Sequence, residues 1–194
     1  MRIHFIAIGG SIMHALAIDA QESGHVVTGS DDEIYEPSRS KLLGKGLLPD
    51  KTGWNPHRIT SEIDIVILGM HAKADNPELL KALELGLRIV SFPGFVAGMS
   101  DQKTRVVIAG SHGKTTTTSM IMHVLKENGK AFDYLVGARL EGFENMARIS
   151  DAPIMIIEGD EYLSSALDRR PKFLHYDPDI TVITGIEWDH MNVF

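Results

Sequence analysis

The residues best suited to chemistry in this chain form a glycine-rich stretch that ends in lysine and threonines. They are Gly110, Ser111, His112, Gly113, Lys114, Thr115 and Thr116. Glycines let backbone N–H groups approach a phosphate without a side-chain clash. Lys114 can reach the β- and γ-phosphates of a nucleotide, and the Thr115 hydroxyl can bind Mg²⁺. The stretch therefore predicts a phosphate-binding loop, with a glycine-rich turn that holds no ligand as the alternative.

The elements around this stretch support the same interpretation. The β-branched run 105–108 predicts a strand before it, and residues 119–126 predict a helix after it. Strand, glycine loop, Lys-Thr and helix are the order found in phosphate-binding loops, where the helix turns its positive N-terminal end to the anion. The fit to G-x-x-x-x-G-K-[ST] is incomplete, because its first glycine would fall on Ile108.

Carboxylates follow another expected strand. The apolar run 154–157 leads directly into Glu158-Gly159-Asp160-Glu161. An acid at the end of a strand beside a phosphate loop is a typical Mg²⁺ ligand, because Mg²⁺ prefers hard oxygen ligands. Glu158 is the first candidate ligand and Asp160 the second, and a solvated acidic turn is the alternative.

Two further polar groups lie near the end of the chain. A strand is expected over 180–186, and it leads into Asp189 and His190, with His190 a possible neighbour of a metal or a phosphate. The run 168–170, Asp-Arg-Arg, is either a substrate clamp or a solvated loop. The chain stops just past the strand, so we expect it to be the N-terminal part of a longer protein.

The first hundred residues carry a second glycine turn. A strand over 3–8 runs into Gly9-Gly10-Ser11, a helix is expected over 12–22, and a strand over 25–29 follows. With Asp31 about twenty positions after the turn, this is the layout of a Rossmann nucleotide site. The third glycine of G-x-G-x-x-G is missing, so the pattern indicates a nucleotide and is weak for NAD(P). Asp31 would bind a ribose hydroxyl or remain a solvated strand-end carboxylate.

The rest of this region predicts further alternating strands and helices. His71 follows a buried strand over 62–70, at the sheet edge where open α/β sheets bind ligands, although a lone histidine there is also compatible with a structural role. Asn76 and Pro77 form a helix start. A strand is expected over 87–92, and residues 93–103 are expected to be a short connection between domains.

Composition limits the classes of protein that the chain can belong to. The net charge of -7 argues against a broad nucleic-acid surface. The absence of cysteine excludes disulfides, thiolate catalysis and cysteine-ligated zinc, and it is compatible with the cytoplasm. The N-terminus begins a strand rather than a signal peptide, and no apolar run approaches the length of a membrane span. We expect a cytoplasmic protein that binds no nucleic acid and is not inserted in a membrane; its oligomeric state stays open.

The motifs at 7–13, 110–116, 158–162 and 187–190, in this order, resemble the Mur ligases, the ATP-dependent amide-forming enzymes of bacterial peptidoglycan. The resemblance implies an α/β fold in which a Rossmann-like, parallel-sheet, UDP-sugar-binding domain is followed by an incomplete P-loop ATP-binding α/β domain. The first would span residues 1–100 and the second residues 101–194, the N-terminal part of the central domain. A third domain beyond the chain would complete the ATP site and bind the acceptor.

The resemblance also assigns roles to residues. The catalytic residues would be Lys114, Glu158 and His190, and the Mg²⁺ ligands would be Thr115, Glu158 and His190. ATP would bind on residues 110–116. The residues that would contact the UDP-sugar are Gly9, Gly10, Ser11, Ile12, Met13, Ser30, Asp31 and His71. Ile12 stands where some relatives have another glycine, which affects the details of the pyrophosphate turn.

The implied reaction joins UDP-N-acetylmuramate to a peptide or amino-acid acceptor through an acyl phosphate. Residues 29–31, 35–37 and 168–176 favour the branch of the family that adds L-alanyl-γ-D-glutamyl-meso-diaminopimelate in peptidoglycan recycling. The branch that adds L-alanine is the alternative. Two other classes compete, a nicotinamide-dependent oxidoreductase and a nucleotide-switch ATPase, and each leaves one of the two glycine turns unexplained.

Overall fold

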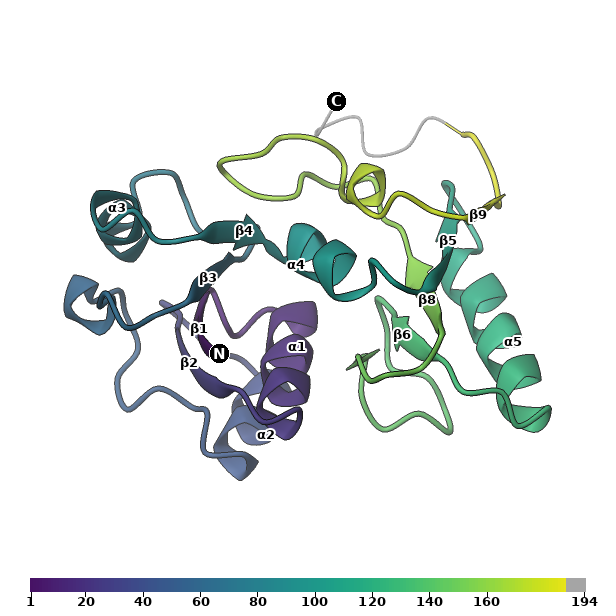
Figure 1. Ribbon diagram of the computed structural model, residues 1–194, viewed down its shortest axis with the longest axis horizontal. Helices are drawn as coiled ribbons and strands as arrows, with labels where there is room; N and C mark the ends of the chain where they lie inside the picture. Colours follow the sequence, from purple (N-terminus) through teal and green to yellow (C-terminus); the bar gives the residue numbers. More distant parts are fainter. Residues whose placement is uncertain (188–194) are drawn as a thin grey trace. The chain divides into compact units, whose positions relative to one another are not determined.

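The structure is a computed structural model that describes residues 1–187 and divides into two compact units (Figure 1). The first unit comprises residues 1–95 with 164–169, and the second comprises 96–163 with the chain from 170 onward. Each unit contains a sheet that is parallel or mainly parallel. The predicted α/β class with parallel sheets is confirmed.

The first unit alternates strands and helices. Its elements are β1 (Arg2–Ile6), α1 (Ser11–Glu22), β2 (Val26–Ser30), α2 (Ser38–Gly44), η1 (Pro56–Arg58), β3 (Ile65–Leu68), α3 (Pro77–Glu84) and β4 (Ile89–Ser91). The strands pair in the order β2-β1-β3-β4, all parallel. The strand order reverses beside β1, because β2 lies on one side of it and β3 on the other. Such a switch point opens a crevice at the carboxyl ends of the strands, where Gly9, Asp31 and His71 follow β1, β2 and β3.

The second unit also contains a mainly parallel sheet, with one antiparallel strand at its edge. Its elements are β5 (Thr104–Ala109), α5 (Lys114–Glu127), β6 (Asp133–Leu135), β7 (Ala147–Arg148), β8 (Ile154–Glu158), η2 (Lys172–His175) and β9 (Ile180–Ile183). The order is β7-β6-β8-β5-β9, and only β7 runs antiparallel to its neighbour among the described strands. Because β5 lies between β8 and β9, the segments that follow these three strands converge at one edge.

The structure corrects several predicted boundaries. The connection predicted over 93–103 is wrong, because α4 (Phe92–Met99) occupies most of it. Phe92, Phe95 and Val96 recur at helical spacing and are buried, and their packing outweighs the two glycines of the helix, Gly94 and Gly98. Pro93 is tolerated because a proline in the first helical turn gives up no hydrogen bond. Similarly, α5 begins at Lys114 rather than at residue 119, and β9 ends at Ile183 rather than at residue 186.

Other predictions are confirmed. The helix after the first glycine turn runs over Ser11–Glu22, one residue longer than predicted. Asn76 caps α3, since its side chain accepts hydrogen bonds from the backbone of Glu78 and Leu79. No helix within residues 1–187 is long and apolar enough to cross a membrane.

Candidate functional site

The loop between β5 and α5 adopts a conformation that requires glycine. Gly110 has a φ of +121° and Gly113 a φ of +80°, in the range that side-chain-bearing residues rarely adopt. A Cβ on Gly110 would lie 2.8 Å from the backbone N and O of Gly185. The Ser111 N–H donates to the Gly185 oxygen at 3.1 Å, and the Thr184 N–H donates to Ala109 O at 2.9 Å. The loop is therefore packed tightly against the end of β9.

The first turn of α5 brings Lys114 and Thr115 to this loop. The Lys114 ammonium donates to the carbonyl oxygens of Gly110 at 2.5 Å and Ser111 at 3.4 Å, and it forms an ion pair with Glu161 at 3.2 Å. The Thr115 hydroxyl donates to Glu158 Oε1 at 2.7 Å. The predicted proximity of Glu158 to the phosphate loop is observed, because β8 pairs directly with β5.

Glu158 also contacts the end of a third element. Its Oε2 accepts a hydrogen bond from the Gly137 N–H at 3.0 Å, just after β6. A threonine hydroxyl and a glutamate carboxylate are the hard oxygen ligands that Mg²⁺ takes, usually one or two from the protein together with substrate phosphates. Within residues 1–187 no group of three or more histidine and acidic side chains converges on one point. Thr115 and Glu158 therefore fit a Mg²⁺ ion that is shared with a phosphate. The predicted Asp189 and His190 lie outside the described residues.

Asp160 has a different partner. Its Oδ2 accepts from the Lys172 ammonium at 2.9 Å, and its Oδ1 accepts from the Tyr162 N–H at 3.0 Å. Burial raises the pKa of Asp160 above its ordinary value, although the Lys172 charge acts in the opposite direction. Glu158, Asp160 and Glu161 are partly buried and all have protein partners, and metal binding by this acidic turn stays a prediction. Asp160 anchors the turn to η2.

A pocket of about 230 Å³ opens beside the loop. It is lined by Ala109, Gly110, Ser111, Glu161, Phe173, Ile183, Gly185, Ile186 and Glu187. Of the remaining predicted loop residues, His112 and Thr116 are exposed, and His112 Nδ1 lies 3.7 Å from Glu187 Oε2. The pocket combines main-chain polar groups, two glutamates and an apolar wall, which suits a ligand with both charged and apolar parts.

The glycine turn of the first unit is held by Asp31. The Gly9 N–H donates to Asp31 Oδ2 at 2.7 Å, and the Asp32 N–H donates to Oδ1 at 3.0 Å. Asp31 is only 6% exposed, so the alternative of a solvated strand-end carboxylate is wrong. Burial raises the pKa of Asp31 to about 6, against the opposing effect of the Gly9 amide. Asp31 thus braces the turn from the end of the neighbouring strand.

The other residues predicted to contact the UDP-sugar differ in their exposure to solvent. Gly10 caps α1, Ser11 and His71 are exposed, and Ile12 is partly exposed. Met13 is buried in the core. Ser30 is fully buried, and its hydroxyl donates to Glu78. The exposed polar residues are therefore accessible to a ligand, whereas Met13 and the Ser30 side chain face the interior of the unit.

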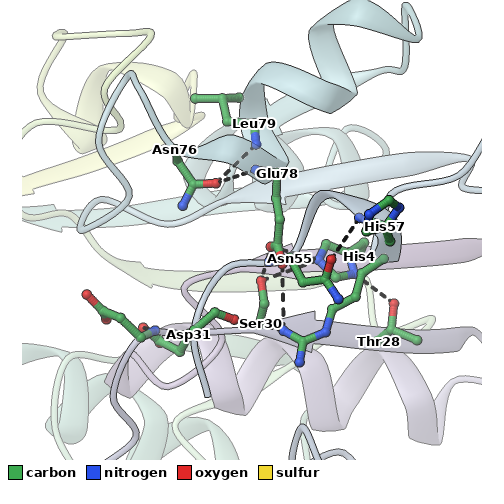
Figure 2. Close-up of polar contacts among 12 residues, drawn as sticks. His4, Thr28, Ser30, Asp31, Asn55, His57, Asn76, Glu78 and Leu79 are labelled. Atoms are coloured by element: carbon green, nitrogen blue, oxygen red, sulfur yellow. Dashed lines mark hydrogen bonds and ion pairs between the residues drawn. The ribbon is translucent and has the colours of Figure 1, made fainter. Parts of the chain in front are cut away.

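A buried polar network around Glu78, shown in Figure 2, was not predicted from the sequence. Glu78 is 0% exposed. Its Oε1 accepts from the Asn55 N–H at 2.8 Å and lies 3.6 Å from Arg58, and its Oε2 lies 3.4 Å from His4 Nε2. Burial acts to raise the pKa of Glu78, but the hydrogen bonds from His4, Ser30 and Asn55 outweigh it and lower the pKa.

This network joins elements that carry the first glycine turn. His4 lies on β1 and Ser30 at the end of β2, next to Asp31, whereas Glu78 belongs to the first turn of α3. The signals that could have indicated it are a histidine inside an otherwise apolar strand and a glutamate directly after an Asn-Pro helix start. Both are compatible with surface positions, so only the fold brings them together.

These units define a class: two α/β units with parallel sheets, the second with a glycine loop and an adjacent Thr–Glu pair, which is the layout of nucleotide-binding proteins. Residues 2–104 match the catalytic domain of the Mur ligase family, and residues 108–194 match the Mur ligase middle domain. The chain belongs to the Mur ligase family.

Individual relatives of two kinds match over nearly the whole chain. UDP-N-acetylmuramate–L-alanyl-γ-D-glutamyl-meso-2,6-diaminoheptandioate ligase of Haemophilus influenzae is 34% identical over 99% of this chain and 42% of that protein. UDP-N-acetylmuramate–L-alanine ligase of Dictyoglomus turgidum is 37% identical over 100% of this chain and 39% of that protein. The chain thus spans about two fifths of the length of these relatives.

Solved structures agree with this result. The crystal structure of UDP-N-acetylmuramate:L-alanyl-γ-D-glutamyl-meso-diaminopimelate ligase from Neisseria meningitides superposes with a TM-score of 0.89 at 34% identity, covering 100% of this chain and 63% of that one. UDP-N-acetylmuramate-alanine ligase from Thermotoga maritima has a TM-score of 0.81 at 28% identity, covering 100% of this chain and 43% of that one.

Proposed function

We propose that this chain is the UDP-sugar- and ATP-binding part of an ATP-dependent amide ligase. The enzyme would join UDP-N-acetylmuramate to L-alanyl-γ-D-glutamyl-meso-diaminopimelate in peptidoglycan recycling. The observation that carries the proposal is the group formed by Lys114, Thr115 and Glu158, at the converging ends of β5 and β8. A lysine, a hydroxyl and a carboxylate beside a glycine loop are the groups that phosphoryl transfer from ATP requires.

In this proposal each of the two units binds a different substrate. Residues 1–100 bind the UDP-sugar through the glycine turn at Gly9 and Gly10, with Asp31 and the exposed Ser11 and His71 at the same sheet edge. Residues 101–194 bind ATP on the loop from Gly110 to Thr116. The tight approach of Gly110 to Gly185 supports this assignment, because it holds the loop amides in one arrangement before a phosphate arrives.

The chemistry needs no nucleophile from the protein. The muramate carboxylate attacks the γ-phosphorus of ATP, which gives an acyl phosphate and ADP, and the acceptor amine then attacks the acyl carbon and expels phosphate. Lys114 and the loop amides offset the charge that builds on the transferred group. Thr115 and Glu158 would hold Mg²⁺, with His190 as a further predicted ligand, and the bound ion would neutralise charge on the phosphates.

Two acceptors are candidates, because relatives of both kinds match at 34% and 37% identity. We assign the tripeptide from the residues at 29–31, 35–37 and 168–176. The L-alanine ligase is the second candidate, favoured by the 37% match. The cytoplasmic location stays a prediction.

The test supplies the full-length protein that contains this chain with ATP, Mg²⁺ and UDP-N-acetylmuramate, plus either the tripeptide or L-alanine, and identifies the products by mass spectrometry. A UDP-muramoyl-tripeptide would support the proposal, and a UDP-muramoyl-alanine would support the second candidate. Nucleotide binding without a response to any UDP-sugar would contradict both and favour a regulatory ATPase. NAD bound more tightly than the UDP-sugar would favour an oxidoreductase.

The two-site assignment has its own test. The Lys114→Ala variant should abolish turnover and leave UDP-sugar binding largely intact, because Lys114 lies in the second unit and the glycine turn at Gly9 in the first. Calorimetry on wild type and variant with UDP-N-acetylmuramate checks this expectation. Equal loss of UDP-sugar binding and turnover would contradict the assignment of separate sites.

A further inference from the structure

Glu161, in the acidic segment that follows β8, has no role in the proposed function and forms an ion pair with Lys114. We propose that it is a positioning residue that holds the Lys114 ammonium across the phosphate loop and is exchanged for a phosphate oxygen when a nucleotide binds. The inference rests on the proposed function of the loop, and it concerns how the loop is kept before ATP arrives.

The donors of Lys114 are fully used in this arrangement. An ammonium group has three N–H donors. Its three acceptors here are Gly110 O at 2.5 Å, Glu161 Oε2 at 3.2 Å and Ser111 O at 3.4 Å. A phosphate oxygen can therefore bind to Lys114 only if one of these acceptors gives up its place.

Glu161 is the acceptor best able to leave. The two carbonyl oxygens belong to the loop backbone, and the Ser111 N–H and the restricted space around Gly110 tie that backbone to Gly185. Glu161 contributes a side chain from outside the loop, so exchanging it for a phosphate oxygen leaves the loop backbone in place. A phosphate would also place negative charge beside the Glu161 carboxylate, and like charges in contact repel.

The ion pair between Lys114 and Glu161 is partly shielded from solvent. The Lys114 side chain is 14% exposed and that of Glu161 is 20% exposed, so solvent screens the pair less than a surface pair. The turn that carries Glu161 is anchored, since Asp160 bonds to Lys172 and the Lys172 N–H donates to Tyr162 O at 2.9 Å. Glu161 therefore lies in the pocket wall next to Gly110 and Ser111, within ion-pair distance of Lys114.

The experiment compares ATP binding by the full-length wild type with three variants, using calorimetry with a non-hydrolysable ATP analogue and Mg²⁺. Glu161→Gln removes the competing charge and should bind the analogue roughly fivefold more tightly, the effect of a partly buried ion pair. Glu161→Asp keeps the charge and should fall between wild type and Glu161→Gln. Glu187→Gln is the matched control, because it removes a negative charge from the same pocket beside His112 and should change the affinity less.

A double-mutant cycle separates this role from a general effect on structure. In the Lys114→Ala background, Glu161→Gln should tighten binding less than it does with Lys114 present, because the ion pair is already broken and only the repulsion between carboxylate and phosphate is relieved. Unchanged or weaker binding by Glu161→Gln, an equal gain in Glu187→Gln, or a gain of the same size without Lys114 would each overturn the inference. If the wild type binds the analogue and Glu161→Gln has no effect on the affinity, only this inference is refuted. If the wild type does not bind the ATP analogue, both this inference and the proposed function are refuted.

Discussion

Replacing Gly110 with alanine tests whether the phosphate loop depends on its close approach to β9. Gly110 has a φ of +121°, and a backbone conformation of this kind costs about 1–3 kcal/mol for a residue with a side chain. The new Cβ would also lie 2.8 Å from three backbone atoms, the N and O of Gly185 and the N of Thr184. Backbone cannot rotate away as a side chain can, so the loop and the strand end must separate.

The separation has a further cost that can be worked out from the contacts. It strains or breaks the hydrogen bonds from Ser111 N–H to Gly185 O and from Thr184 N–H to Ala109 O, and each contributes about 1 kcal/mol. Together with the backbone strain, the expected loss in the free energy of unfolding is about 3–5 kcal/mol. Since domains of this size are stable by about 5–15 kcal/mol, the variant should fold but be much weakened, and its loop should bind ATP poorly.

Urea denaturation followed by circular dichroism measures the loss, with Gly129→Ala as the matched control. Gly129 follows α5 with a φ of +63°, and a Cβ there would meet no atom within 4 Å. The control therefore reports backbone strain alone, which we expect to cost about 1–2 kcal/mol. If Gly110→Ala lost no more stability than Gly129→Ala and bound ATP like the wild type, the reasoning about the loop and β9 would be refuted.

Three further variants test the buried charges. Lys103→Met should destabilise by about 3–5 kcal/mol in urea, because the fully buried Asp133 loses the ammonium 2.7 Å away; full retention of stability would contradict this. The pKa of Asp31 is raised to about 6, so ionising this carboxylate costs the folded wild type stability as the pH rises from about 4 to 6. Asp31→Asn cannot ionise and should gain up to about 3 kcal/mol relative to wild type over that range. Parallel pH curves for the two proteins would contradict this. Glu78→Gln should behave oppositely, because the pKa of Glu78 is lowered in the folded protein. The variant should lose about 1–3 kcal/mol of unfolding free energy at pH 7, and this loss should disappear as the pH falls through the pKa of Glu78. A loss that does not depend on pH would count against the network.

Much of the second unit could be predicted because its signals are local. The run before Gly110, the glycine loop and Lys114-Thr115 determine a strand, a turn and a helix start within a dozen residues. The contact between Thr115 and Glu158 follows from one non-local rule, that parallel strands present their carboxyl ends at the same sheet edge. Sequence reasoning therefore finds a site when its residues lie at strand ends.

The parts that sequence reasoning missed depend on burial. Asp31 follows its strand as a solvated carboxylate would, and only the packing around Gly9 makes it a buried brace. Glu78 stands at a helix start, a usual place for an exposed acid, yet it lies beneath Asn55 and against His4. The helix α4 was missed because its glycines suggest a turn, whereas its stability comes from tertiary packing of Phe95 and Val96.

The two glycine turns differ in how a carboxylate holds them, and the difference has a consequence for binding. In the first unit Asp31 is tied to a main-chain N–H, and the lack of a Cβ on Gly9 lets it stay there, since a Cβ would lie 2.8 Å from Asp31 Oδ2. In the second unit Glu161 is tied to the Lys114 side chain, which can change partners. A ligand that leaves this hydrogen bond in place contacts Gly9 by close approach and not through its N–H, so the turn needs little rearrangement. A ligand of the second replaces one anion with another, so its measured affinity is the difference between two interactions of the same lysine.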